Sequence, residues 1–248
     1  MSAAPGQRTI VVPDIDWVEI PGGEFVYQEG ERRELPMFFM ARYPVTNVQY
    51  KTFIDAGGYG NERWWQDLVR PEPQVSRWPQ ANRPKTNVDW YEAVAFSRWL
   101  SAQLGYEVRL PTEEQWERAA RGRDGRQYPW GWRYASGHAN LNETKGIVVE
   151  GDFGEWFLQQ ATAVGVYPQG ASSEGVLDLA GNVWEWCLNG YVQLGQVGVN
   201  TVGDTRCVRG GSWSRSPREA RSAQRSGDLA DGRGPLLEFR LVSSASIA

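Results

Sequence analysis

Three side chains have the chemistry of soft metal ligands or nucleophiles: Cys187, Cys207 and His138. Thiolates bind copper, zinc and iron, and imidazole acts as a metal ligand or general base. Two cysteines are too few for a disulfide framework, so we expect a reducing compartment and leave open one bridge between them. A non-haem iron site usually needs at least two imidazoles, and this chain has one histidine. Redox or metal catalysis would therefore depend on these three residues.

Motifs of other enzyme classes are missing from the sequence. A Ser-His-Asp triad could be built only on His138, and no Gly-x-Ser-x-Gly elbow is present. There is no Walker loop, and no Gly-x-Gly-x-x-Gly segment follows a strand. His138 lies in the segment 136–140 (SGHAN), which is typical of a loop, so we expect a surface or packing role. The many carboxylates show no spacing that singles out an acid–base pair.

The composition is that of an acidic, aromatic-rich chain. A net charge of −4 and a pI near 5.3 argue against nucleic acid as a partner. Only three of the 26 basic residues are lysine, and the rest are arginine, whose planar bidentate contacts suit interfaces. A GC-rich genome would give the same bias. Thirteen Trp and 28 Gly indicate aromatic anchors joined by loops with unusual backbone angles.

The domain organisation that we expect is simple. Residues 1–13 are predicted to be a mobile leader and residues 14–248 a single domain, because no Pro/Gly-rich linker divides the chain. No stretch approaches the roughly 18 apolar residues of a membrane span, and no secretory signal is visible. The cytoplasm is the default location, and surface display is left open.

Capping residues indicate where helices begin and end. Thr46 precedes a short helix that Gly57 stops, and Asp89 precedes the best helix of the chain, 90–104, which Gly105 ends. Thr112 and Gln115 form a capping box for a third helix. After residue 123 the sequence indicates no helix.

Strands are indicated by alternation at 17–27, around a hairpin or bulge at Gly22-Gly23, and by apolar runs at 37–43 and 239–242. The segment 60–88 reads as a long loop held by tryptophans. Two main helices on a small antiparallel sheet, with about half of the chain in loops, is an α+β fold.

Eight segments resemble, in order, the formylglycine-generating-enzyme (sulfatase-modifying-factor) family. The resemblance covers residues 17–243 and implies a C-type-lectin-like fold. The segments are 21–25 (PGGEF), 43–47 (YPVTN), 88–93 (VDWYEA), 109–117 (RLPTEEQWE), 128–131 (YPWG), 178–186 (DLAGNVWEW), 209–213 (RGGSW) and 239–241 (FRL).

The same resemblance argues against catalysis. Enzymes of the family that oxidise a sulfatase cysteine use two copper-binding cysteines downstream of the Gly-Gly-Ser-aromatic motif. The matching positions here hold Arg215 and Ala220, and residues 212–248 contain no cysteine. Neither residue supplies the soft thiolate that copper(I) needs, so we predict that the chain is not an enzyme.

The resemblance also implies a structural calcium site, although no cofactor is required. In the family, oxygens of one turn hold calcium, and the matching residues are Asp178, Gly181, Val183 and Glu185. The alternative is that Glu185 binds backbone in a tight turn. A weaker second site begins at Asn140 and Leu141, for which the sequence shows no acidic partner.

The segment 213–238 is predicted to be a variable ligand-binding surface. In many relatives it is rich in Asn between fixed residues, whereas here other residues replace the Asn. The ligand-binding positions that we predict are Trp213, Ser214, Arg215, Ser216, Arg218, Glu219, Gln224, Ser226, Gly227, Asp228, Leu229, Gly232, Gly234, Pro235 and Leu236.

This pattern resembles the variable proteins of diversity-generating retroelements, in which randomised adenines change Asn codons within a constant scaffold. Glu219 departs from the pattern. Randomising the adenines of an Asn codon cannot produce a Glu codon, because the third base of the Asn codon is a pyrimidine. The expected function is non-catalytic binding of an unknown ligand, a protein or other macromolecule. Two alternatives remain: a non-variable accessory or binding member of the family, and a metal-dependent oxidase with a different site.

Overall fold

The computed structural model describes residues 10–145, 151–152, 154–191 and 205–245. Of the leader predicted at 1–13, residues 1–9 lie outside this part, and residues 10–13 have no regular secondary structure. The end of the predicted domain, 246–248, also lies outside it.

A four-stranded sheet with the order β10-β7-β8-β9 forms the centre of the molecule. Its strands are β7 (Trp184–Gly190), β8 (Thr205–Arg209), β9 (Arg225–Leu229) and β10 (Leu237–Phe239). The pairs β7–β8 and β8–β9 are antiparallel, whereas β10 runs parallel to β7. Strand β9 is therefore an edge strand made entirely from the predicted variable segment.

A second sheet, β1-β4-β11, ties the two ends of the described chain together. Its strands are β1 (Trp17–Ile20), β4 (Phe38–Ala41) and β11 (Val242–Ser243). A separate antiparallel hairpin consists of β2 (Gly23–Tyr27) and β3 (Glu31–Leu35), and β5 (Tyr134–Ala135) pairs with β6 (Gly151–Asp152).

The three helices form where their caps indicate. They are α1 (Asn47–Asp55), α2 (Trp90–Leu104) and α3 (Glu113–Arg121). Thr46, Asp89 and Thr112 each form a capping box, which confirms all three predicted starts. Among the described residues after 123, only short 3-10 turns occur, η3 (Pro168–Gly170) and η4 (Pro217–Ala220); η1 (Gly58–Gly60) and η2 (Glu62–Trp65) lie earlier.

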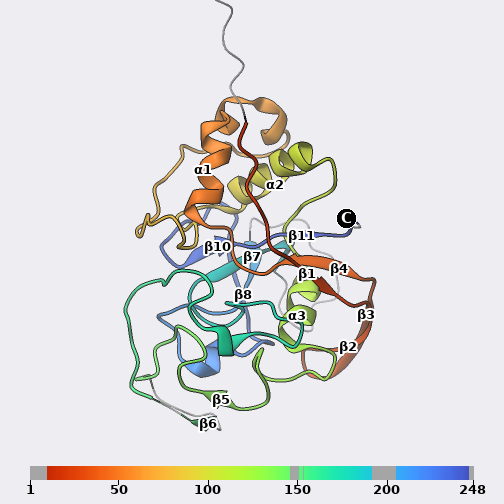
Figure 1. Cartoon of the computed structure of the whole chain (residues 1–248), viewed down its shortest axis with the longest axis vertical. Coiled ribbons are helices and arrows are strands. Elements are labelled where there is room, and N and C mark those ends of the chain that lie inside the picture. Colours follow the sequence, from red (N-terminus) through yellow and green to blue (C-terminus); the bar gives the residue numbers. More distant parts are fainter. Residues whose placement is uncertain (1–9, 146–150, 153, 192–204, 246–248) are drawn as a thin grey trace, which may run out of the picture.

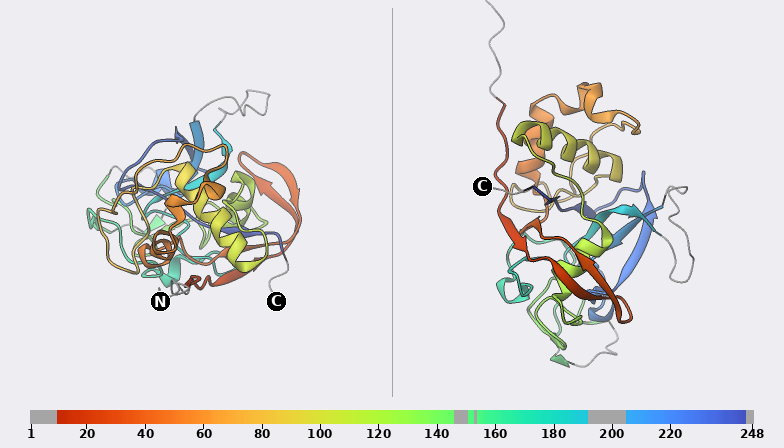
Figure 2. Two further views of the ribbon diagram at one scale, coloured as in Figure 1. Left: turned by 90° about the horizontal axis from the view of Figure 1, so that it is seen from above. Right: turned by 90° about the vertical axis from the view of Figure 1, so that its right-hand side faces the viewer.

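The helices divide the apolar interior into two main clusters. In Figure 1, α1 and α2 lie above the β7–β10 sheet, and the cluster between them contains Phe53, Phe96 and Phe239. Helix α3 packs on the other side with β1 and β4, and its Trp116 lies with Cys187 and Cys207. Figure 2 shows the β2–β3 hairpin projecting beside α3. The α+β fold that we expected is present.

Two predicted strands differ from the structure. Residues 17–27 do not form a hairpin at Gly22-Gly23, because β1 pairs with β4 and β2 pairs with β3. A Cβ atom on Gly22 would lie 2.6 Å from the backbone nitrogen of Met37, so glycine is needed where the chain changes sheets. Residues 239–242 are also not one strand, since β10 ends at Phe239 and β11 begins at Val242.

Candidate functional site

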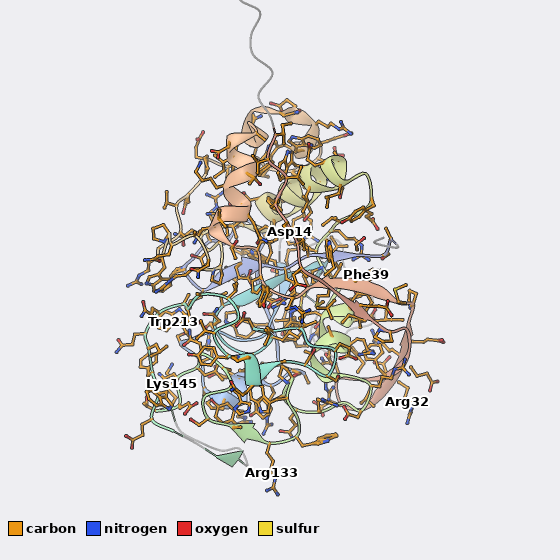
Figure 3. All side chains as sticks on the ribbon, viewed as in Figure 1. Asp14, Arg32, Phe39, Arg133, Lys145 and Trp213 are labelled. Atoms are coloured by element: carbon orange, nitrogen blue, oxygen red, sulfur yellow. The ribbon has the colours of Figure 1, made fainter. Side chains whose placement is uncertain are left out.

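The first part of the predicted recognition surface is built around Trp213. Its ring meets Trp78 edge-on at 5.9 Å between centroids and stacks on Phe157 at 6.1 Å. The backbone beside it is fixed, because Asn142 N–H donates to the carbonyl of Arg215 (2.9 Å) and Lys145 Nζ donates to that of Ser214 (2.7 Å). Figure 3 shows Lys145 and Trp213 on the same flank of the molecule. Side chains here project from an anchored backbone.

The turn η4 explains two of the predicted positions. Ser216 and Glu219 form a capping box, in which Glu219 Oε2 accepts from Ser216 N and Oγ at 3.1 and 2.9 Å. Ser216 is buried, so little of its side chain is accessible, and its contact with a ligand stays a prediction. Glu219 has a structural task in the same turn, which accounts for its departure from the substitution pattern.

The second part follows the edge strand β9 and the loop after it. Gln224 and Leu229 are exposed, and Ser226 and Asp228 are half-buried. Leu236 packs partly into the core, and its carbonyl accepts from Trp184 N–H at 2.7 Å. Part of the Leu236 side chain is therefore held in the core, and its contact with a ligand stays a prediction.

The three glycines of this part differ in the space around them. A Cβ atom on Gly227 would lie 2.6 Å from the Tyr191 ring, and one on Gly232 would lie 2.8 Å from the carbonyl of Leu229. Gly234 has nothing within 4 Å of that position, and its neighbour Pro235 is half-buried. Side chains at Gly227 and Gly232 are excluded by contact, whereas Gly234 tolerates one. The first two are thus poor positions for diversity.

The carboxylates predicted to hold calcium have different surroundings. Both oxygens of Glu185 accept from the guanidinium of Arg240 (2.7 and 2.8 Å), and Oε2 also accepts from Trp116 Nε1 (2.7 Å). Asp178 Oδ2 accepts from Gly165 N–H, and burial raises the pKa of Asp178 to about 6. Glu185 therefore pairs with a cation of the chain itself rather than with a backbone turn.

This donor set fits calcium only in part. Asp178 Oδ1 accepts no hydrogen bond from the described residues, and the carbonyls of the turn at Gly181 and Val183 supply oxygens of the right type. An ion would nevertheless have to share Glu185 with Arg240. Within the part of the chain that the structure describes, no cluster of three or more His, Cys, Asp or Glu side chains is arranged to hold a metal. Calcium at this turn stays a prediction.

The second predicted calcium position lies at the wall of a small cavity. Asn140 Nδ2 donates to the Gln160 carbonyl and to Asn182 Oδ1, while its Oδ1 has no hydrogen-bond partner in the described structure. Leu141 is buried beside it, and Glu143 lines the same cavity. Glu143 is therefore an acidic neighbour of Asn140, only three residues further along the chain. This spacing is common in proteins, so the sequence alone does not indicate a site.

The two thiols face each other inside the protein. Cys187 of β7 and Cys207 of β8 lie in one apolar cluster and are hydrogen-bonding neighbours, and both side chains are fully buried and free. Burial raises the pKa of Cys187 well above that of an ordinary thiol, which disfavours the thiolate. His138 lies in a loop against Trp130, with ring centroids 5.3 Å apart. It stands apart from the thiol pair in a different cluster.

A second set of buried charges has no local signal in the sequence. Arg209 is fully buried and pairs with Glu117 and Glu113, and Arg225 adds a further pair to Glu113 (2.6 Å). On the sheet face of Glu185, Glu238 is fully buried, and no side-chain donor in the described part of the chain reaches its carboxylate. Such partners come from segments about 90 residues apart, so no local pattern signals them.

Comparison with known proteins gives the family. The model of the sulfatase-modifying factor enzyme 1-like domain matches residues 5–245. This chain belongs to that family. An inactive C-alpha-formylglycine-generating enzyme 2 from Mus musculus is 31% identical over 92% of this chain and 85% of its own length. Hercynine oxygenase from Mycobacterium tuberculosis is 33% identical over 79% of this chain, which spans half of that relative.

Solved structures agree on the fold of this sulfatase-modifying-factor-like protein. Treponema denticola variable protein 1 superposes with a TM-score of 0.67 at 20% identity and covers 98% of this chain and all of that one. The formylglycine-generating-enzyme type of C-type-lectin-like fold is thereby confirmed. No helix among the described residues is both long and apolar enough to cross a membrane.

The two positions that the resemblance matches to the family's catalytic cysteines are unlike each other. Arg215 is exposed and pairs with Glu219 at 3.0 Å, whereas Ala220 is fully buried. Cys187 and Cys207 belong to the cluster behind the central sheet and not to this turn. The turn carries no sulfur that could bind a metal.

Proposed function

We propose that this sulfatase-modifying-factor-like protein is a non-catalytic ligand-binding protein with a diversified recognition surface. The observation that carries the proposal is the turn at 215–220, where an exposed Arg and a buried Ala replace the thiols on an otherwise intact scaffold. A site that lacks its soft ligands can bind molecules but cannot perform the family's copper-dependent oxidation.

The backbone geometry supports tolerance of substitution. Main-chain hydrogen bonds from Trp213 N–H to the Asn182 carbonyl (2.8 Å) and from Ser222 N–H to the Gln127 carbonyl (2.7 Å) hold the segment. These bonds do not depend on side-chain identity. The positions whose side chains are open to change are Ser214, Arg215, Arg218, Gln224, Ser226, Asp228, Leu229, Gly234 and Pro235.

The chemistry of this surface favours a macromolecular ligand. Arg215, Arg218 and Leu229 are exposed and Trp213 is half-buried, and Arg and Trp are enriched among residues that dominate protein interfaces. The fold likeness to a variable protein supports the same interpretation. We propose a protein as the ligand, bound through side chains that differ between copies of the gene.

Sequencing around the gene tests diversification. We expect a nearby repeat of the segment that encodes residues 213–236, differing from the gene at adenines, together with a reverse transcriptase gene. Substitutions among clonal isolates should fall at the open positions and spare Ser216, Gly227 and Gly232, which serve as internal controls. Equal substitution at the three control codons, or the lack of a repeat, would remove diversification from the proposal.

The competing function is a metal-dependent oxidase that uses the thiol pair. It is favoured by one observation, the close approach of Cys187 and Cys207 in one buried cluster. We expect that protein treated with copper(I) and then desalted keeps less than about 0.1 equivalents of copper, because burial disfavours the thiolate form. One equivalent of copper, lost in Cys207→Ser and accompanied by oxygen consumption with a thiol substrate, would show that the chain is an enzyme.

A further inference from the structure

A cavity of about 270 Å³ lies next to the recognition surface. Ala139, Leu141 and Leu158 give it apolar walls, and Trp156 and Tyr167 add aromatic rings. It is joined to the surface by Phe157, which stacks on Trp213. Trp156 is 64% exposed, so the rim is reachable from solvent. None of the lining residues belongs to the segment 213–236.

A buried negative charge sits in the lining. Glu143 is 2% exposed and accepts from four neutral groups: Tyr134 OH (2.5 Å), Ser136 Oγ (2.7 Å), Gly137 N–H (3.4 Å) and Gly154 N–H (2.8 Å). Within residues 10–145, 151–152, 154–191 and 205–245, no Lys, Arg or His forms an ion pair with it. Its hydrogen bonds are satisfied, but its charge has no counterpart.

The negative charge of Glu143 affects the tyrosines around the cavity. Burial, followed by the nearby carboxylates Asp178 and Glu143, raises the pKa of Tyr167. The same carboxylate, after burial, contributes to the raised pKa of Tyr134. A low-dielectric cavity with one uncompensated negative charge attracts a cation.

A second polar group in the lining also lacks a partner. Asn140 is 2% exposed, and its Oδ1 accepts no hydrogen bond in the described structure. Its Nδ2 is committed to two acceptors, which fixes the amide orientation and leaves the oxygen as the acceptor. An N–H donor on the bound group would satisfy it.

We propose that this cavity binds an alkyl cation with N–H donors, the side chain of a lysine or arginine of the ligand. The methylene stem would lie along the apolar walls, and the head group would lie near Glu143 and Asn140 with Trp156 at the rim. A divalent metal ion fits less well, because both oxygens of Glu143 are already engaged by four donors. The inference rests on the proposed function only in taking a protein as the ligand, and it assigns the cavity as a constant anchor beside a variable surface.

Matched small probes test the chemistry of the cavity. We expect Nα-acetyl-lysine methylamide or Nα-acetyl-arginine methylamide to bind in the millimolar range by ligand-observed NMR or calorimetry. Nα-acetyl-norleucine methylamide, which has a stem of similar length and no charge, should bind on the order of tenfold more weakly. Comparison of the two cationic probes identifies the preferred head group. Equal binding of norleucine, or no binding of either cation, overturns the proposal.

Variants of the exposed rim locate the binding. Trp156→Ala should weaken binding of the cationic probe about three- to tenfold, the range expected when a cation–π contact is lost. Leu158→Lys should abolish it by placing a competing cation at the entrance. Trp132→Ala removes a ring of similar exposure, 58%, that is not part of the lining and should leave the affinity unchanged.

Two outcomes separate this inference from other interpretations. Unchanged affinity in Trp156→Ala and Leu158→Lys with an unchanged melting temperature would place the probe elsewhere and overturn the proposal. Displacement of the probe by calcium chloride, but not by magnesium chloride, would reassign the cavity to a metal ion. The probes reach no residue of 213–236, so their failure leaves the recognition surface as proposed, and failure of the gene-sequencing test leaves the cavity as proposed.

Discussion

Arg240→Met is expected to lower the free energy of unfolding by about 3–5 kcal/mol, the cost of removing one partner from a buried ion pair. Every donor of the Arg240 guanidinium is used: two bonds reach Glu185, and the others reach the carbonyls of Ala41, Arg42 and Leu177 at 2.8–3.0 Å. The variant would leave Glu185 as a second unpaired carboxylate beside Glu238. Urea denaturation followed by far-UV circular dichroism measures the loss.

Two further variants make the reason for this loss testable. Arg126→Met removes an exposed pair with Asp124 and should change stability by less than about 0.5 kcal/mol. Arg240→Met combined with Glu185→Met removes both charges and should recover part of the stability, because no unpaired Glu185 remains. If the double variant is no more stable than Arg240→Met alone, the three carbonyl contacts, and not the ion pair, hold the core.

The helices were predictable because their signals are local. The capping boxes at Thr46, Asp89 and Thr112 each join residues three positions apart, so a short segment contains the whole signal. Strand pairing is different. Gly22-Gly23 resembles a hairpin locally, yet it marks the close approach of residues 35–37, which only the tertiary structure reveals.

The C-terminal strand shows how a buried charge can interrupt a strand pattern. Residues 239–242 alternate as a strand, but Arg240 turns inward to Glu185, 55 residues away. Phe239 pairs with Trp186 in one sheet and Val242 with Met40 in the other. From sequence, an arginine in an apolar run is expected to point from a strand into solvent. Arg240 instead points into the core, between the strand that ends at Phe239 and the strand that begins at Val242.

The recognition segment was located from sequence, but the accessibility of single positions was not. Ser216 reads as one more substituted residue until its capping role in η4 is known. Gly227 looks permissive until the Tyr191 ring is placed against it. Substitution patterns report where change is found, and only packing shows where a side chain has room.

Glu238→Met is expected to raise the free energy of unfolding by about 1–3 kcal/mol at pH 8, the usual penalty of a buried polar group without partners. Glu238 is fully buried in β10 opposite Glu185, and no side chain among the described residues donates a hydrogen bond to its carboxylate. Methionine has a similar length and no charge, so it can fill the same space. Chemical denaturation at several pH values measures the gain.

The gain should depend on pH with a definite sign. Burial, and then the charge of Glu185, raise the pKa of Glu238 well above its ordinary value of 4.5, so the folded state keeps a proton that the unfolded chain releases. The stability that Glu238 contributes is therefore full below about pH 4.5 and is lost as pH rises through the raised pKa. The advantage of Glu238→Met should be small at pH 4 and grow with pH. Asp178, whose pKa is raised to about 6, and Asp89 and Glu92, whose pKa values burial also raises, contribute a slope of the same sign that the variant keeps. An advantage that does not change with pH would mean that Glu238 has the same pKa in the folded and the unfolded chain. A loss of stability at pH 8 would mean that its carboxylate has a cation partner in solution.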